Sequence, residues 1–168
     1  MRRLAAAAAL LAAAACASTR PSTKPSAVVG KPVTVRAADL DGREHDVRAD
    51  DGKVRVVDFW ATWCDPCRDQ LPFLDRMSAK YAERGLTVYG VSFDEDRGAL
   101  ERYLGEMHPS FTVLWDKGGA VLADPLEVTR LPTTLFVDRK GLVREVHLGF
   151  EKGEERDLEA LLQRLLAE

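Results

Sequence analysis

Residues 57–68 read Val57-Asp58-Phe59-Trp60-Ala61-Thr62-Trp63-Cys64-Asp65-Pro66-Cys67-Arg68, the end of a short apolar run followed by two cysteines. The run begins at Val54 and is rich in β-branched residues, which is typical of a strand covered on both faces of a parallel sheet. Beyond the second cysteine, apolar residues recur at helical spacing up to Tyr81, and Gly85 follows where such a helix would end. This stretch therefore predicts a strand, a short turn carrying the cysteines, and a helix.

The rest of the chain continues the alternation of strands and helices. Apolar runs predict further strands at residues 86–93, 111–115, 133–138 and 142–148, and helical spacing predicts helices at 100–107 and 158–166. Alternation around Asp41-Gly42 predicts a hairpin over residues 33–47, and residues 120–123 are expected to form a short, weakly helical piece. This order indicates an α/β sheet that is covered by helices and has an antiparallel edge.

Length and composition limit the classes of protein to which the chain can belong. A chain of 168 residues with 46% apolar and 30% charged residues fits one folded domain with an ordinary core. A net charge of −3 and an aromatic content of 7% favour neither a basic patch nor a stacking platform, so no nucleic-acid partner is expected. No apolar run reaches the roughly 18 residues of a membrane-spanning helix, which excludes a multi-pass membrane protein.

The amino terminus has the pattern of an export signal. A short basic segment at residues 1–3 precedes the Ala/Leu run 4–15, which is too short to span a membrane but fits the hydrophobic region of a secretory signal peptide. Cys16 comes next, after small residues. This arrangement resembles a bacterial lipoprotein signal, in which the cysteine becomes the lipidated first residue. It departs from the usual pattern in having Ala13 three positions before the cysteine.

The segment that follows favours the same interpretation, because residues 18–26 are polar and rich in Pro, Ser and Thr, so residues 16–27 are expected to form an extended tether. We therefore expect a signal peptide over residues 1–15, lipid on Cys16, and a flexible tether that leads to the globular domain. Two alternatives remain open, namely ordinary A-x-A cleavage after Ala15 or Ala17, and a helical tail of the domain itself.

Cys64 and Cys67 are the candidate reactive residues of the chain. Cysteines three positions apart at a helix start lie close enough to form a small disulfide ring. Cys64 would lie near the unpaired N–H groups and the positive end of the helix dipole, which favour the reactive thiolate, whereas Cys67 would be more buried and act later. A purely structural disulfide is a poor alternative, because so small a ring removes little entropy from the unfolded chain.

A zinc site fits the sequence poorly. Structural zinc needs four ligands, and beyond the cysteine pair the chain offers only Cys16 and the scattered His45, His108 and His147. There is also no Gly-rich phosphate-binding loop. We therefore expect neither a metal nor a cofactor.

In its context the stretch at residues 57–68 resembles the active site of the thioredoxin superfamily. The hairpin pattern before the first core strand, and the stretch Arg130-Leu131-Pro132-Thr133-Thr134-Leu135-Phe136-Val137-Asp138, resemble the exported, membrane-anchored TlpA/ResA-like branch. The resemblance runs from about Val28 to the carboxyl end, so one domain over residues 28–168 is expected. It implies a thioredoxin-like α/β fold, with a central mixed sheet flanked by helices, an N-terminal β-hairpin and an extra βα insertion.

The resemblance also implies roles for individual residues. Cys64 would attack a substrate disulfide to give a mixed disulfide, which Cys67 would then resolve. Pro132 would be a cis-proline that lies against the cysteine pair, and Leu131 would offer its backbone to the substrate chain. The residues expected to contact the substrate are Trp63, Asp65, Pro66, Leu131 and Thr133.

Resolution of the mixed disulfide requires Cys67 to lose a proton. The TlpA/ResA-like branch often has Glu three residues beyond the second cysteine, where this chain has Gln70. Asp58 instead lies in the predicted strand, where ordinary thioredoxins keep a buried acid. A buried carboxylate is costly without a purpose, so we expect Asp58 to accept the proton, with a structural role as the alternative. The acidic cluster at residues 94–96 is interpreted as a solvated face or a helix start.

Together these features predict an exported thiol–disulfide oxidoreductase, held through Cys16 on the periplasmic side of a bacterial membrane and acting as a reductant. As partners the resemblance suggests protein disulfides, such as those of apocytochrome c or copper-site assembly proteins, and a membrane thiol transporter as electron donor. A thiol peroxidase is one alternative, but its Pro-x-x-x-Thr-x-x-Cys loop is absent because position 57 holds Val57. A copper-binding assembly protein is another, and it would need more widely spaced cysteines and a distal histidine.

Overall fold

A computed structural model describes residues 27–49 and 52–168 of the chain. Its centre is a five-stranded sheet with the strand order β5-β4-β3-β6-β7. The strands are β3 (Val54–Trp60), β4 (Leu86–Ser92), β5 (Thr112–Trp115), β6 (Thr133–Val137) and β7 (Val143–Leu148). β3, β4 and β5 are parallel, whereas β6 is antiparallel to β3 and β7 is antiparallel to β6. The predicted signal peptide, Cys16 and the tether up to residue 26 lie outside the described residues.

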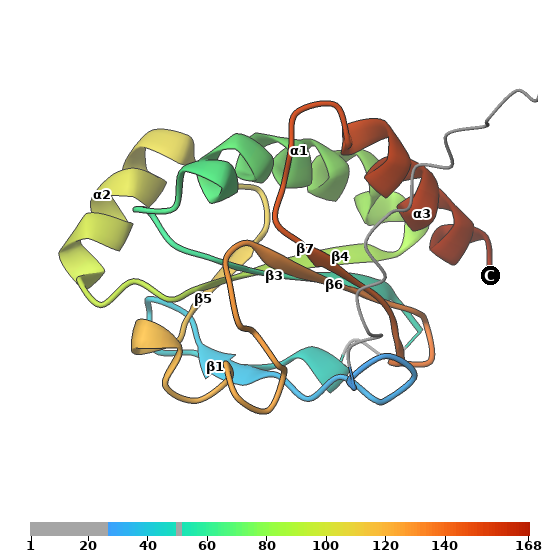
Figure 1. Cartoon of the computed structure of the whole chain (residues 1–168), viewed down its shortest axis with the longest axis horizontal. Helices are drawn as coiled ribbons and strands as arrows, with labels where there is room; N and C mark the ends of the chain where they lie inside the picture. Colours follow the sequence, from blue (N-terminus) through green and yellow to red (C-terminus); the bar gives the residue numbers. More distant parts are fainter. Residues whose placement is uncertain (1–26, 50–51) are drawn as a thin grey trace, which may run out of the picture.

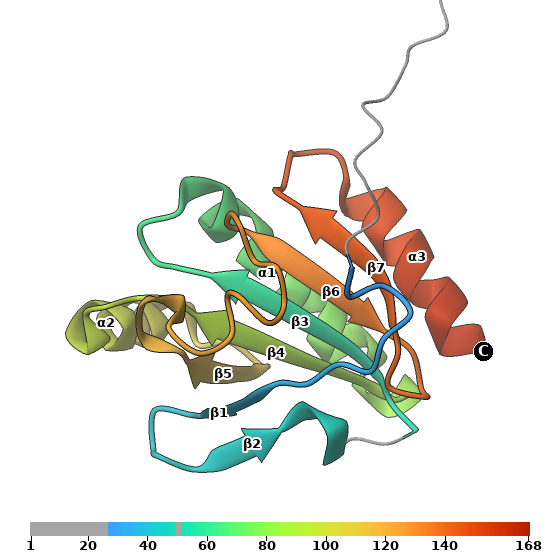
Figure 2. The ribbon, with the colours of Figure 1, turned by 60° about the horizontal axis from the view of Figure 1, so that its bottom comes forward.

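Different layers cover the two faces of this sheet. One face is covered by helices α1 (Asp65–Tyr81), α2 (Arg97–Met107) and α3 (Glu155–Ala167) (Figure 1). Below the other face lies the hairpin of β1 (Arg36–Ala38) and β2 (Glu44–Asp46), and Figure 2 shows it alongside β4 and β5. Three short 3-10 helices complete the elements of the described ranges, namely η1 (Val47–Ala49), η2 (Ala82–Arg84) and η3 (Lys117–Gly119). The thioredoxin-like α/β fold with its N-terminal hairpin is confirmed.

The central strand β3 carries two sets of side chains, because successive residues of a strand point to opposite faces of the sheet. All seven residues of β3 are buried. Val56 and Trp60 pack in the core under the helices, whereas Val57 and Phe59 pack in the core on the hairpin side. Asp58 lies between Val56 and Trp60 in this alternation, so its carboxylate faces the helix side.

The short helical piece predicted at residues 120–123 forms no regular helix, although the N–H of Ala123 donates to the carbonyl of Gly119 as in a single helical turn. The structure has η3 and then a series of turns instead. The two glycines of η3 have φ values of 65° and 70°, a left-handed conformation that an α-helix does not contain. The carboxylate of Asp116 accepts the backbone N–H groups of Val121 and Leu122, which a helix would have bonded to carbonyl groups.

Candidate active site

The two cysteines occupy the junction between β3 and α1. The chain leaves β3 at Trp60 and turns, and the N–H of Cys64 donates to the carbonyl of Ala61 at 3.1 Å. Cys64 is the N-cap of α1, and the two cysteines form a disulfide with a Cα–Cα distance of 5.3 Å. Cys64 is 7% exposed and Cys67 is fully buried. Cys64 therefore keeps slight contact with solvent, and Cys67 has none.

The start of α1 favours negative charge on the Cys64 sulfur. Cys64 Sγ accepts the backbone N–H of Cys67 at 3.3 Å, so an N–H group of the first helical turn already points at this atom. The positive end of the helix dipole lies at the same place. Both effects stabilise a thiolate on Cys64 once the disulfide is reduced, and the thiolate is the nucleophile in disulfide exchange.

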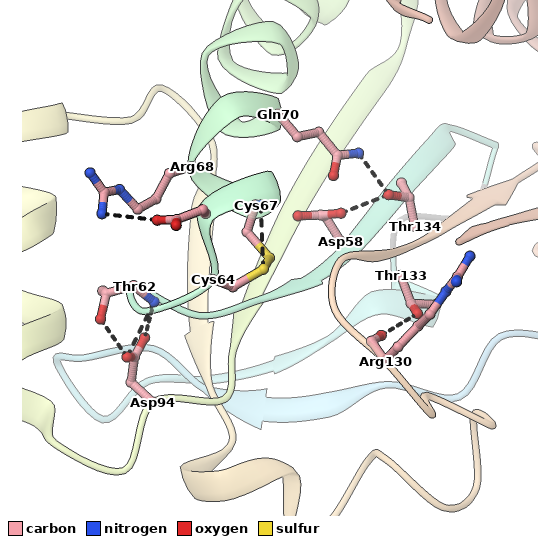
Figure 3. The surroundings of a disulfide bond; sticks show 11 residues. Asp58, Thr62, Cys64, Cys67, Arg68, Gln70, Asp94, Arg130, Thr133 and Thr134 are labelled. Carbon is pink, nitrogen blue, oxygen red and sulfur yellow. Dashed lines mark hydrogen bonds and ion pairs between the residues drawn. A yellow bond between two sulfur atoms is a disulfide. The ribbon is translucent and has the colours of Figure 1, made fainter. Parts of the chain in front are cut away.

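A buried hydrogen-bonded chain lies beside Cys67. Gln70 Nε2 donates to Thr134 Oγ1 at 2.9 Å, and Thr134 Oγ1 donates to Asp58 Oδ1 at 2.7 Å. Figure 3 shows Gln70 on α1, Asp58 on β3 and Thr134 on β6 close together, with both hydrogen bonds meeting at Thr134, on the same side of the sheet as Cys67. Within the described part of the chain, the second carboxylate oxygen, Asp58 Oδ2, accepts no hydrogen bond.

This environment alters the acidity of Asp58. Burial raises the pKa of its carboxyl from 3.8 to about 7, and the hydrogen bond from Thr134 opposes part of that rise. A carboxyl with a pKa near neutrality can both accept and return a proton at physiological pH. Gln70 has no titratable group, so it can only orient the hydroxyl of Thr134.

The loop before β6 is distant from the cysteines in sequence but lines the same cleft as Cys64. The Leu131–Pro132 peptide bond is cis. An open cleft of about 1110 Å³ has Trp63, Cys64 and Pro66 on its wall together with Arg130 and Leu131. Two stretches that are distant in sequence thus line one cleft.

The residues expected to contact substrate differ in how far they are exposed to solvent. Trp63 is 68% exposed beside Cys64 and offers a large apolar surface to a partner. The side chain of Asp65 points into solvent and forms an ion pair with Arg68 at 3.5 Å. Thr133 is not among the residues that line the cleft. It is buried in β6, and its hydroxyl donates to the carbonyl of Arg130 at 2.7 Å.

The sequence analysis missed Asp94. The acidic cluster was interpreted as a solvated face or a helix start, which is right for Asp96, the N-cap of α2, and wrong for Asp94, which is 2% exposed. Its carboxylate accepts the backbone N–H and the hydroxyl of Thr62, two residues before Cys64 (Figure 3). One signal was available: Asp94 follows β4, and carboxyl ends of adjacent parallel strands meet at one edge of a sheet.

Within residues 27–49 and 52–168, no three or more His, Cys, Asp or Glu side chains are grouped so that they could hold a metal ion. In the same ranges, no helix is both long enough and apolar enough to cross a membrane.

Comparison with known proteins agrees with this geometry. The Redoxin family model matches residues 22–162. The thiol-disulfide oxidoreductase ResA of Bacillus cereus is 31% identical over 127 residues, which are 76% of this chain and 72% of the relative. The thiol:disulfide interchange protein DsbE of Pseudomonas aeruginosa is 34% identical over 155 residues, covering 88% of this chain and 83% of the relative.

A solved structure extends the comparison to three dimensions. A protein from Chlorobium tepidum, described as a thiol:disulfide interchange protein DsbE, superimposes with a TM-score of 0.77 at 30% identity. The match covers 82% of this chain and 96% of that one. Because sequence, fold and the Cys64–Cys67 disulfide agree, the chain belongs to the Redoxin family and is a thiol–disulfide oxidoreductase with a thioredoxin-like fold.

Proposed function

We propose that the protein reduces disulfides of other exported proteins, with Cys64 as the attacking and Cys67 as the resolving cysteine. The observation that carries this proposal is the unequal placement of the two sulfurs. Cys64 lies at the helix start and on the wall of the cleft, whereas Cys67 is fully buried. Trp63 and Pro66 on one wall and Leu131 on the other are the surfaces that would hold the substrate chain, and the buried cis-proline Pro132 would fix the backbone of Leu131.

The reaction proceeds by two exchanges. The Cys64 thiolate attacks one sulfur of the substrate disulfide, a mixed disulfide forms, and the other substrate sulfur leaves as a thiolate. Cys67 then gives its proton to Asp58 and attacks Cys64 Sγ, which forms the Cys64–Cys67 disulfide and releases the second substrate thiolate. The substrate gains two electrons and the protein loses them, so another dithiol must reduce the protein before the next cycle.

The resemblance to the TlpA/ResA-like branch supports disulfides of apocytochrome c or of copper-site assembly proteins as substrates, and a membrane thiol transporter as the source of electrons. The test compares three activities of the domain, namely coupled reduction of a protein disulfide, peroxide turnover and copper binding. We expect disulfide reduction alone. Peroxide turnover or tight copper binding without disulfide reduction would contradict the proposal.

The proposal predicts a reducing potential for the Cys64–Cys67 couple. Asp65, next to Cys64, offers the thiolate no positive charge, so the dithiol should give up its electrons readily. We expect a potential of roughly −200 to −270 mV when the protein equilibrates with glutathione. A potential above about −150 mV would indicate an oxidase instead.

We further propose that residues 1–15 are removed on export and that Cys16 becomes the lipidated first residue of a tethered domain over residues 28–168. A single acyl chain binds membranes weakly, whereas two or more chains anchor a domain stably. Mass spectrometry of the mature protein should find a multiply acylated N-terminal Cys16, and Cys16→Ala should move the protein from the membrane fraction to the soluble fraction. An unmodified N-terminus at Ser18 would contradict lipidation but would leave export intact.

A further inference from the structure

A buried carboxylate that the exchange reaction does not use holds the turn before Cys64. Asp94 accepts the backbone N–H of Thr62 at 3.0 Å and the Thr62 hydroxyl at 2.6 Å. It also accepts the hydroxyl of Ser92 at 2.8 Å. Asp94 and Cys64 line the same cleft, and Figure 3 shows the carboxylate reaching the turn that carries Cys64.

Asp94 cannot easily turn away from this position. Its own backbone N–H donates to Ser92 Oγ at 3.1 Å, and its carbonyl accepts the indole N–H of Trp115 at 2.7 Å. Both its main chain and its carboxylate are therefore fixed. A change at this residue acts on Cys64 through the turn from Ala61 to Cys64, which the Cys64 N–H closes by donating to the Ala61 carbonyl.

The charge of Asp94 is less screened than that of Asp65, the acidic residue next to Cys64 in sequence. Within the described residues, every hydrogen-bond donor to its carboxylate is a neutral group, namely a backbone amide and two hydroxyls. Asp65 is closer to Cys64 in sequence, but its side chain is 91% exposed and paired with Arg68, so water and the guanidinium screen it. A buried charge is screened much less, so its field reaches further through the protein.

We propose that Asp94 is a positioning residue that also acts electrostatically. It holds the turn that presents Cys64, and its negative charge opposes the Cys64 thiolate, which keeps the dithiol reducing. This inference rests on Cys64 being the attacking thiol. At equilibrium, the protein disulfide and two glutathione thiols exchange with the protein dithiol and glutathione disulfide. A destabilised Cys64 thiolate disfavours the protein dithiol, so the equilibrium shifts toward the protein disulfide and reduced glutathione.

Asp94→Asn tests the charge, because the amide oxygen can still accept the N–H of Thr62. We expect roughly three- to tenfold faster alkylation of Cys64 below its pKa, as for a thiol pKa lowered by about half a unit to one unit. Measured above the Cys64 pKa, where the thiolate predominates, the equilibrium constant with glutathione should move by a similar factor toward the dithiol, which corresponds to a potential about 15 to 30 mV less negative.

Asp96→Asn is the matched control. Asp96 lies on the same cleft and loses the same charge, but its side chain is 72% exposed, and Asn is an equally good helix N-cap. The control should leave both the alkylation rate and the equilibrium constant close to those of the wild type. Equal shifts in Asp94→Asn and Asp96→Asn would overturn the inference, as would no shift in Asp94→Asn.

Ser92→Ala separates charge from a loosened turn, and it also serves if Asp94→Asn does not fold. This variant keeps the carboxylate charge and removes one donor that partly neutralises it, so alkylation of Cys64 should slow by about twofold. Faster alkylation in Ser92→Ala would mean that loosening of the turn, not charge, controls Cys64. If the wild-type protein does not exchange with glutathione, the proposed function itself is contradicted. If the wild type does exchange, and Asp94→Asn has the same alkylation rate and equilibrium constant, only this inference is contradicted.

Discussion

Cys64→Ser should abolish disulfide reduction, with turnover lower by a factor on the order of 10³ or more, because within the described residues no other thiol lies at the helix start facing the cleft. Cys67→Ser should also stop turnover, but at a later step. Its Cys64 can still attack a substrate disulfide, and the mixed disulfide then has no resolving thiol. The exposure of Cys64 at 7% and the complete burial of Cys67 are the structural reasons for this order.

Insulin offers a protein disulfide for this test, with non-reducing electrophoresis as the measurement. Cys67→Ser should accumulate an adduct that thiols release, and Cys64→Ser should show none. Alkylation of the reduced wild type should modify Cys64 far faster than Cys67. Equal adducts in both variants, or preferential alkylation of Cys67, would reverse the roles assigned to the two cysteines.

Asp58→Asn should slow the resolving step by roughly 100-fold near neutral pH, the usual size of a lost general base, while alkylation of Cys64 stays nearly unchanged. The pKa of Asp58 is raised to about 7 by burial, so the carboxyl is protonated below that pH and cannot take the proton of Cys67. Turnover of the wild type should therefore rise as pH approaches 7 and level off above it. The variant should lack this rise.

Two control variants test whether the effect belongs to Asp58. Gln70→Ala removes a side chain that cannot titrate, so it should lower turnover only a few-fold. Thr134→Val removes the hydrogen bond that lowers the pKa of Asp58, so the pH profile should move to higher pH, and Thr134→Ser should restore it. If Asp58→Asn turns over like wild type from about pH 6 to 9, Asp58 is a structural carboxylate.

The same carboxyl links stability to pH. Its pKa is about 7 in the folded protein and near 3.8 in the unfolded chain, so between these values the folded state binds the extra proton. The free energy of unfolding should therefore fall as pH rises from 4 to 7, and Asp58→Asn should lack this fall. Above pH 7 the variant should be more stable by up to about 4 kcal/mol, as three pKa units imply, measured by urea unfolding.

The sequence by itself determined the local structure around the cysteines. The β-branched run of β3, the Cys-x-x-Cys spacing and the apolar repeat of α1 are encoded by neighbouring residues, so their periodicity predicts a strand, a turn and a helix without the rest of the chain. The burial of Asp58 could be predicted in the same way, because its apolar neighbours on both sides fix it inside a covered strand.

Only the tertiary structure decided which distant groups meet at this site. Thr134 donates to Asp58 across 76 positions of sequence, and Thr62 donates to Asp94 across 32. These contacts follow from the pairing of β3 with β6 on one side and with β4 on the other, and a side chain carries no local sign of which strand will lie beside it. The same pairing buries Asp94, which its acidic neighbours made look solvated, and turns Thr133 away from the cleft.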